Sequence, residues 1–242
     1  MNIGIFGDSY GLPKPEQKKG KHWAEHLVDF GYSVDNQCEE ATSLYYTYSK
    51  YLKNKNLYDR IIFLITHPKN IYVPSLKNYP HITDHEAVIR LLAKAKEKNF
   101  TEQEIETLIA LDYYYKYLNN LESAMQVRTF HECLSNSITD PHVLKIPSFS
   151  DSLSNVECSL HDIHMIDIIY FDINNLNIKY KDTKRSFVVN DLRHGHLNNE
   201  NNFILAKKIK AWIDTGNFIF KKENFVISTD SLETNFKINY EL

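Results

Sequence analysis

The apolar segment Arg60–Thr66 limits the possible folds of this chain more than any other stretch. Its interior, Ile-Ile-Phe-Leu-Ile, does not alternate between apolar and polar positions. That pattern is typical of a strand buried on both faces of a sheet. Such strands occur mainly in parallel sheets, whose strands are connected by helices. The segment therefore predicts an α/β protein with helices on both sides of its sheet.

The residues before this segment show the alternation that a parallel sheet requires. Two short apolar runs, Ile3–Phe6 and Tyr32–Val34, are predicted to be strands. Two longer stretches, Lys21–Phe30 and Glu39–Leu52, carry apolar residues at helical spacing. The order strand, helix, strand, helix, strand predicts a mostly parallel sheet over the first part of the chain.

The second half of the chain is predicted to add further elements of both kinds. The predicted strands are Val143–Pro147, Phe187–Asn190 and, less regularly, Met165–Phe171. The last long helix is predicted over Asn198–Asp214. The tail alternates enough to predict a hairpin, for example Asn224–Ser228 with Phe236–Tyr240.

The length of 242 residues fits a single domain, 1–242, with additions. One addition is a helical insertion at about 83–136, and the other is a C-terminal extension at about 215–242. The insertion carries Tyr113, Tyr114, Tyr115 and Tyr117, which cannot all face one way on a helix. We expect part of this aromatic group to line a site entrance or a subunit contact.

Composition excludes several classes of protein. The formal net charge is −3, which does not suggest a nucleic-acid partner. The three cysteines, Cys38, Cys133 and Cys158, are odd in number and widely spaced, so we expect reduced thiols. No signal peptide is visible, and the apolar runs are too short for a membrane span. The expectation is a cytoplasmic protein.

The residues after the first predicted strand carry the clearest functional signal. Gly7 ends the strand, and Asp8-Ser9-Tyr10 follow directly. The carboxyl end of a buried strand is where open α/β sheets bind their ligands. The tetrapeptide resembles the first block, Gly-Asp-Ser-(Leu/Phe/Tyr), of the SGNH/GDSL hydrolases, in which the serine is the nucleophile. Asp8 is expected to shape the turn by hydrogen bonds to nearby backbone and to take no part in the chemistry.

A second stretch, just before the last predicted helix, resembles the final block of that family. The block reads Asp-x-x-His, and the histidine is usually followed by an apolar residue and a helix cap. His196-Leu197-Asn198 matches this downstream pattern, with Asp191 five positions before the histidine. Asp191-Leu192-Arg193-His194 matches the spacing literally, which makes His194 the alternative base. A serine nucleophile needs such a base, and the base needs an acceptor that orients it.

The two middle sequence blocks of the family do not occur in this chain in their usual form. The second block normally supplies a glycine whose backbone N–H joins the oxyanion hole, and the best match here is Ala41. The third block normally reads Gly-x-Asn-Asp after the third strand. In this chain Thr66 and His67 follow that strand, and Asn70 comes a little later. Ala41, Asn70 and Thr66 are therefore the candidates for the oxyanion hole.

The resemblance implies a fold, a reaction and a set of roles. The fold is a three-layer α/β/α domain with a mostly parallel, five-stranded, flavodoxin-like sheet. The reaction is hydrolysis or transfer of an ester-linked acyl group through a triad of Ser9, His196 and Asp191, without a cofactor or metal. The substrate would be an ester of a small molecule, a glycan or a lipid. The substrate's identity and the oligomeric state are left open.

Three other interpretations compete with this one. The first is a metal site for a phosphoesterase, with ligands drawn from His161, Asp162, His164, Asp191, His194 and His196. The second is nucleotide binding at Gly4-x-x-Gly7, which lacks the full glycine fingerprint. The third is a binding module that has the SGNH fold and no catalytic activity.

Overall fold

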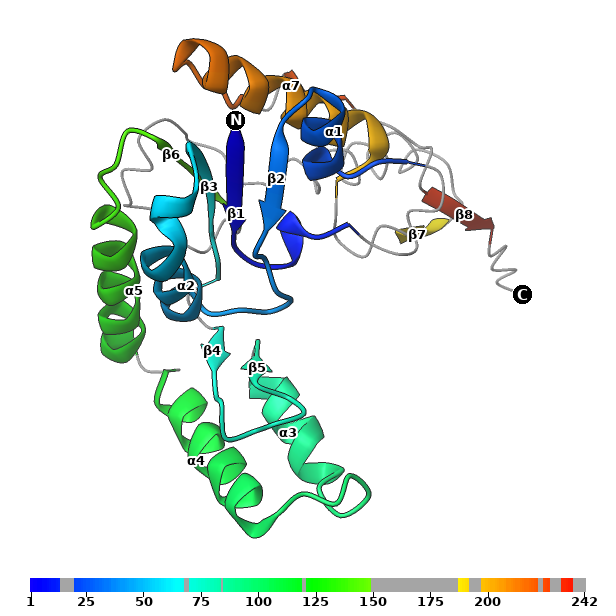
Figure 1. Ribbon diagram of the computed structural model, residues 1–242. Helices are drawn as coiled ribbons and strands as arrows, with labels where there is room; N and C mark the ends of the chain where they lie inside the picture. The colour runs from blue at the N-terminus through cyan, green and yellow to red at the C-terminus, as the bar shows by residue number, and fades with distance from the viewer. Residues whose placement is uncertain are drawn as a thin grey trace.

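The computed structural model describes residues 1–13, 20–67, 70–83, 85–118, 121–148, 187–191, 197–221, 224–226 and 232–236. Its centre is a four-stranded sheet in the order β2-β1-β3-β6 (Figure 1). The strands are β1 (Asn2–Phe6), β2 (Ser33–Asn36), β3 (Arg60–Ile65) and β6 (Val143–Pro147). All three strand pairs are parallel, so the prediction of a mostly parallel sheet is confirmed.

Strand β3 lies inside the sheet and is hydrogen-bonded on both sides. Ile62 is paired with Ile5 of β1 and with Leu144 of β6. The side chains from Ile61 to Ile65 are buried along the whole strand. This position explains the continuous apolar sequence of β3, because neither face of the strand meets water.

One face of the sheet is covered by α1 (Trp23–Asp29) and α7 (Asn199–Thr215). The two helices pack against each other (Figure 1). Trp23 and Leu205 join Ile5 in one hydrophobic cluster. Asn198 caps α7 by accepting a hydrogen bond from the Asn201 N–H at 2.7 Å. The structure therefore confirms the helix predicted just after His196.

The other face is covered by α2 (Leu44–Asn54) and α5 (Leu121–Asn136) (Figure 1). Tyr51 of α2 packs edge-on against Phe63 of β3 at a centroid distance of 5.7 Å. A short 3-10 helix, Lys55–Leu57, leads from α2 into β3. Helices thus flank the sheet on both sides, as the buried β3 predicts.

Helix α2 begins later than Glu39, the residue at which the sequence predicts its start. Ala41 has a φ of 57°, in the left-handed region, which a right-handed helix excludes. Ser43 then caps the helix, and its side chain accepts a hydrogen bond from the Tyr46 N–H at 3.2 Å. The residues from Glu39 to Ser43 consequently form a loop at the carboxyl edge of the sheet.

A smaller lobe projects beyond the carboxyl edge of the sheet (Figure 1). It consists of β4 (Ile71–Tyr72), β5 (His81–Ile82), α3 (His85–Ala93) and α4 (Glu102–Leu118). Its core is a separate hydrophobic cluster that includes Leu76, Val88, Leu108 and Tyr115. The lobe begins at β4, before the predicted insertion at about 83–136, and α5 contacts both α2 and α4.

Two strands in the C-terminal part of the chain pair apart from the main sheet. β8 (Leu232–Phe236) pairs antiparallel with β7 (Phe187–Asp191), and the two form a sheet of their own. The predicted hairpin, Asn224–Ser228 with Phe236–Tyr240, lies mostly outside the described residues. The predicted strand Met165–Phe171 lies outside the described residues, and the described part of the main sheet has four strands.

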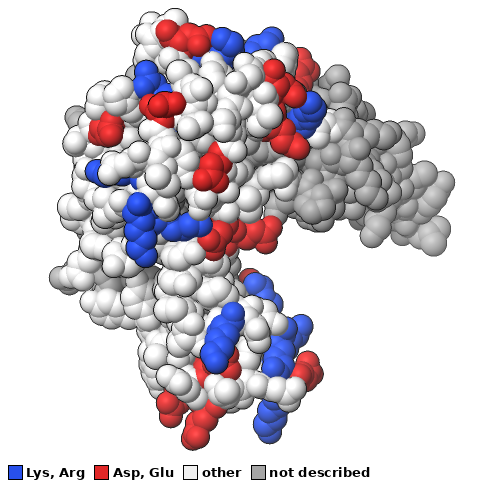
Figure 2. Space-filling model, viewed as in Figure 1, with Lys and Arg blue, Asp and Glu red and all other residues white. Residues whose placement is uncertain are grey.

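The described residues bear on the predictions about membrane spans, cysteines and surface charge. Within them, no helix is both long and apolar enough to cross a membrane. Cys38 and Cys133 are free thiols, while Cys158 lies outside the described part of the chain. Acidic and basic side chains are interspersed on the face shown in Figure 2.

Candidate active site at the carboxyl edge of the sheet

Ser9 lies in the turn that follows β1, at the carboxyl edge of the sheet. It opens a 3-10 turn, Ser9–Gly11, which Asp8 caps by accepting a hydrogen bond from the Tyr10 N–H at 3.1 Å. Gly7 allows this turn to pack closely, because a Cβ atom there would lie 2.4 Å from the Leu64 Cβ. Asp8 thus has the turn-shaping hydrogen bond that the sequence predicts.

The Asp8 carboxyl is also a buried titratable group, which sequence reasoning missed. One oxygen accepts the Tyr10 bond and a 3.4 Å hydrogen bond from the Ser148 hydroxyl. The other oxygen is buried and has no hydrogen-bond partner among the described residues. Burial raises the pKa of Asp8 to about 7, against the opposing effect of these hydrogen bonds. No sequence pattern indicated how deeply this side chain is buried.

The loop after β2 is fastened to the Ser9 turn by two hydrogen bonds. The Gly7 carbonyl oxygen accepts one from the Glu39 N–H at 3.1 Å and one from the Thr42 hydroxyl at 3.2 Å. Ala41 lies between these two donors and has the left-handed φ of 57°. Glycine adopts this conformation most readily, so the alanine occupies a backbone position typical of glycine.

The other two oxyanion candidates differ in their surroundings. Asn70 is buried, and its side-chain amide donates a hydrogen bond to the Thr42 carbonyl at 3.1 Å. An amide nitrogen carries two hydrogens, so this bond leaves one available. Thr66 is completely buried, and its hydroxyl has no hydrogen bond in the described part of the chain. Asn70 is thus hydrogen-bonded to Thr42, the residue that follows Ala41. Thr66 is a poorer candidate for the oxyanion hole, because its side chain is completely buried.

The proposed base cannot be located directly. His194 and His196 lie outside the described residues, and of Asp191 only the backbone in β7 is described. The metal-ligand candidates His161, Asp162 and His164 also lie outside them. Within the described ranges, no group of three or more His, Cys, Asp or Glu side chains is placed to hold a metal ion.

His22 is a described histidine beside the Ser9 turn, but its hydrogen bonds indicate a structural role. Its Nε2 lies 3.0 Å from the Tyr10 carbonyl oxygen, and its Nδ1 accepts a hydrogen bond from the Ala24 N–H. One neutral tautomer satisfies both contacts, with the proton on Nε2. His22 therefore holds the start of α1 against Tyr10.

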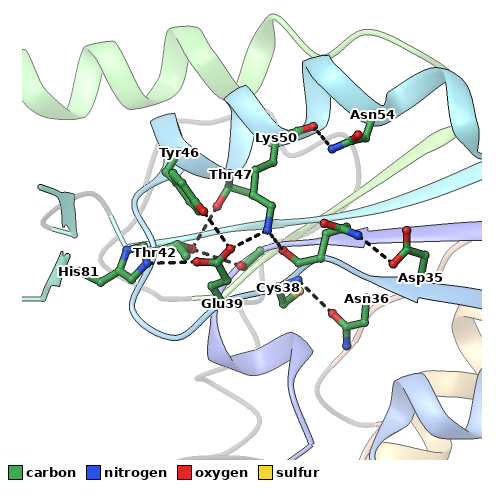
Figure 3. A network of polar contacts seen from close by, with 12 residues as sticks. Asp35, Asn36, Cys38, Glu39, Thr42, Tyr46, Thr47, Lys50, Asn54 and His81 are labelled. Carbon is green, nitrogen blue, oxygen red and sulfur yellow. Dashed lines mark hydrogen bonds and ion pairs between the residues drawn. The ribbon is translucent and has the colours of Figure 1, made fainter. Parts of the chain in front are cut away.

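A polar network centred on Glu39 lies beside this turn (Figure 3). The Glu39 carboxylate accepts hydrogen bonds from Tyr46 at 2.9 Å and Lys50 at 2.7 Å, both from α2. On the other side, Nε2 of His81 in β5 lies 3.3 Å away. The Tyr72 ring packs against Tyr46 at a centroid distance of 4.2 Å, tilted by 34°, and also packs against His81. The network therefore connects the sheet to the lobe.

Two members of the network, Glu39 and Tyr46, have shifted pKa values. Burial raises the pKa of Glu39, but the hydrogen bonds from Lys50 and Tyr46 outweigh it and hold the pKa below its ordinary value. Burial and the same carboxylate raise the pKa of Tyr46 to about 12. Sequence reasoning missed this group, because His81 is 42 residues from Glu39 and no motif connects them.

Comparison with protein-family models, curated proteins and solved structures finds no match to this chain.

Proposed function

We propose that this protein hydrolyses or transfers an ester-linked acyl group with Ser9 as the nucleophile, in the manner of the SGNH/GDSL hydrolases. The observation that carries the proposal is the pair of hydrogen bonds from the loop after β2 to the Gly7 carbonyl. They hold Ala41 beside the Ser9 turn, at the carboxyl edge of a parallel sheet. Ligands bind at this edge in open α/β proteins.

The proposed oxyanion hole uses backbone N–H groups of Ser9 and Ala41 and the remaining amide hydrogen of Asn70. Preorganised donors of this kind stabilise the negative charge that develops on the substrate carbonyl oxygen. The left-handed backbone at Ala41 supports its assignment, since this is where the family has a glycine.

His196 is the proposed base, and contacts at the start of α7 support this choice. Asn202, in the first turn of α7, accepts a hydrogen bond from the Trp23 N–H at 3.1 Å. The Trp23 indole in turn donates to the Tyr10 carbonyl at 2.9 Å. Residue 196 is thus joined to a helix whose first turn is linked to the residue next to Ser9. His194 remains the alternative base.

The proposed reaction has two half-reactions. The Ser9 hydroxyl oxygen attacks the ester carbonyl carbon while His196 accepts its proton, and Asp191 orients the imidazole. The protonated His196 returns the proton to the departing alcohol, which leaves an acyl group on Ser9. Water, or a second alcohol in a transferase, then attacks the acyl group and releases Ser9.

The proposal also retains the finer fold prediction, a fifth parallel strand in a flavodoxin-like three-layer arrangement. The observed order β2-β1-β3-β6 supports it, because a further strand can be added beside β6. The substrate remains an ester of a small molecule, a glycan or a lipid.

The decisive experiment compares wild-type protein with Ser9→Ala on p-nitrophenyl acetate and on a fluorophosphonate label. The variant should lose the serine-dependent rate, on the order of a million-fold in triad enzymes, together with labelling. Ser49→Ala is the matched control, since the Ser49 hydroxyl bonds to the Tyr45 carbonyl within α2. An inert wild type would favour the binding module. Activity that survives Ser9→Ala but is lost with EDTA would favour the metal site.

A further inference from the structure

The left-handed backbone at Ala41 has to be held by its surroundings. A non-glycine residue with a φ of 57° is strained, and it persists only where neighbouring contacts fix it. Glu39 and Thr42, which flank Ala41, are the residues that bond to the Gly7 carbonyl. The conformation of the loop after β2 therefore depends on the contacts that hold these two residues.

The lobe contacts both of them. Asn70, directly before β4, donates a hydrogen bond from its side-chain amide to the Thr42 carbonyl at 3.1 Å. His81 of β5 lies with its Nε2 3.3 Å from Oε2 of Glu39 (Figure 3). β4 and β5 pair with each other, so both contacts originate at one small sheet. The lobe thus contacts the loop after β2 on both sides of Ala41.

His81 is enclosed by rings that orient it for this contact. Tyr72, its partner across the strand pair, packs on the His81 ring at a centroid distance of 5.1 Å, and Tyr46 of α2 packs edge-on at 5.4 Å. The His81 side chain is 14% exposed. A carboxylate only accepts hydrogen bonds, so Nε2 carries the hydrogen. The lowered pKa of Glu39 keeps the carboxylate ionised at neutral pH, which strengthens the bond.

The same carboxylate is also bonded from α2, but those bonds have a different consequence. Tyr46 and Lys50 both donate to Oε1, whereas His81 donates to Oε2. Helix α2 begins directly after the loop, so its bonds connect the loop to its own continuation. The bond from His81 connects the loop to a lobe with a hydrophobic core of its own.

We propose that His81 is a positioning residue for the loop after β2, acting through Glu39, and that the lobe thereby fixes the proposed oxyanion donor Ala41. The inference rests on the proposed function, and it gives the lobe a part in that reaction. An oxyanion donor stabilises charge that develops in the transition state. Loss of its correct position therefore lowers kcat and leaves KM unchanged.

The first measurement is residue-resolved amide hydrogen exchange, which does not require enzyme activity. His81→Phe keeps a ring between Tyr46 and Tyr72 and removes the donor. Exchange of the Glu39 amide, which bonds to the Gly7 carbonyl, should become about tenfold faster, the effect of one hydrogen bond to a charged group. His81→Gln retains an N–H near the position of Nε2 and should restore most of the protection. An unchanged exchange rate in folded His81→Phe would overturn the proposal.

His85→Phe is the matched control. Like His81, His85 contacts a carboxylate through Nε2, here that of Asp112 at 2.6 Å, and it stacks on a tyrosine ring, that of Tyr115. This pair joins α3 to α4 within the lobe, so the variant weakens the lobe without removing a contact to the loop after β2. Exchange of the Glu39 amide should stay as in the wild type. Equal acceleration in both variants would overturn the proposal, because lobe stability alone would then explain the protection.

The second measurement is hydrolysis of p-nitrophenyl acetate by the same variants. His81→Phe should lower kcat about tenfold with KM unchanged, less than the roughly 100- to 1000-fold cost of deleting an oxyanion donor. His81→Gln should recover most of this loss, and His85→Phe should match the wild type. An active wild type whose kcat is the same in His81→Phe would overturn the proposal. A wild type without activity would refute the proposed function instead, and the exchange rates would still decide whether His81 holds the loop.

Discussion

The Thr42 hydroxyl donates its hydrogen to the Gly7 carbonyl oxygen, 3.2 Å away, and lies 3.1 Å from the Thr47 hydroxyl. Because a hydroxyl has a single hydrogen, Thr47 must be the donor in the second contact. The backbone before Ser9 and the first turn of α2 are therefore connected through one buried side chain.

Replacing Thr42 with valine should loosen this connection. Thr42→Val keeps the shape of the side chain, removes the bond to Gly7 and leaves the buried Thr47 hydroxyl unpaired. We expect a loss of about 1–2 kcal/mol in the free energy of unfolding, measured by urea denaturation. Thr47→Val, which leaves the Gly7 bond in place, should cost less and should spare the esterase rate more. Equal losses in both variants would show that the Gly7 bond has no special importance.

The raised pKa of Asp8 predicts that the protein becomes less stable as pH rises. Its folded-state pKa of about 7 lies above the ordinary 3.8, so the folded protein holds a proton between these values that the unfolded chain has released. Stability therefore falls as pH rises through this window. From pH 5 to pH 8 the loss should be about 2–3 kcal/mol.

The matched variant is Asp8→Asn, which can still accept the Tyr10 hydrogen bond and does not titrate. Its unfolding free energy, relative to wild type, should rise from pH 5 to pH 8 by the amount that the wild type loses. Parallel stability profiles for the two proteins across this range would show that Asp8 does not titrate there.

Lys50 should matter for stability at neutral pH more than other lysines of α2. It donates to the Glu39 carboxylate at 2.7 Å and to the Gln37 carbonyl at 3.0 Å. Lys50→Met should lower the unfolding free energy by about 1 kcal/mol in urea denaturation at pH 7. The exposed Lys53, whose side chain has no hydrogen bond or ion pair with the described residues, provides Lys53→Met as the control.

The effect of Lys50→Met should also depend on pH in a defined direction. The pKa of Glu39 is lowered in the folded state, so its stabilising contribution is present above the ordinary value of 4.5 and is lost as pH falls below it. The gap in stability between wild type and Lys50→Met should therefore narrow in acid. A gap that stays constant down to pH 3 would mean that Glu39 is not the relevant partner.

The two central strands of the main sheet could be predicted because each one is a short, continuous apolar run in the sequence. Runs such as Ile3–Phe6 and Ile61–Ile65 contain no polar side chain, as burial on both faces of a strand requires. The start of α2 was misplaced for an equally local reason. Helical spacing continues back to Glu39, and the left-handed backbone of Ala41 that stops the helix leaves no trace in the spacing.

The candidate site was only partly predictable. The turn at Ser9 and the role of Asp8 follow from a short motif at a strand end. The partners of Glu39 depend on how the lobe packs against the sheet, and contacts over such separations have no sequence signature. The contacts of α5 with both α2 and α4 have no sequence signature either, because a helical pattern does not specify the partner of a helix.

The lobe has a hydrophobic core of its own, separate from the two clusters that hold the sheet. Regions with separate cores can open as independent cooperative units. A cavity of about 390 Å³ has walls from both units, with β4 and α4 from the lobe, α2 from the sheet layers and α5 in contact with both. Local unfolding of either unit would therefore remove part of the walls of this cavity.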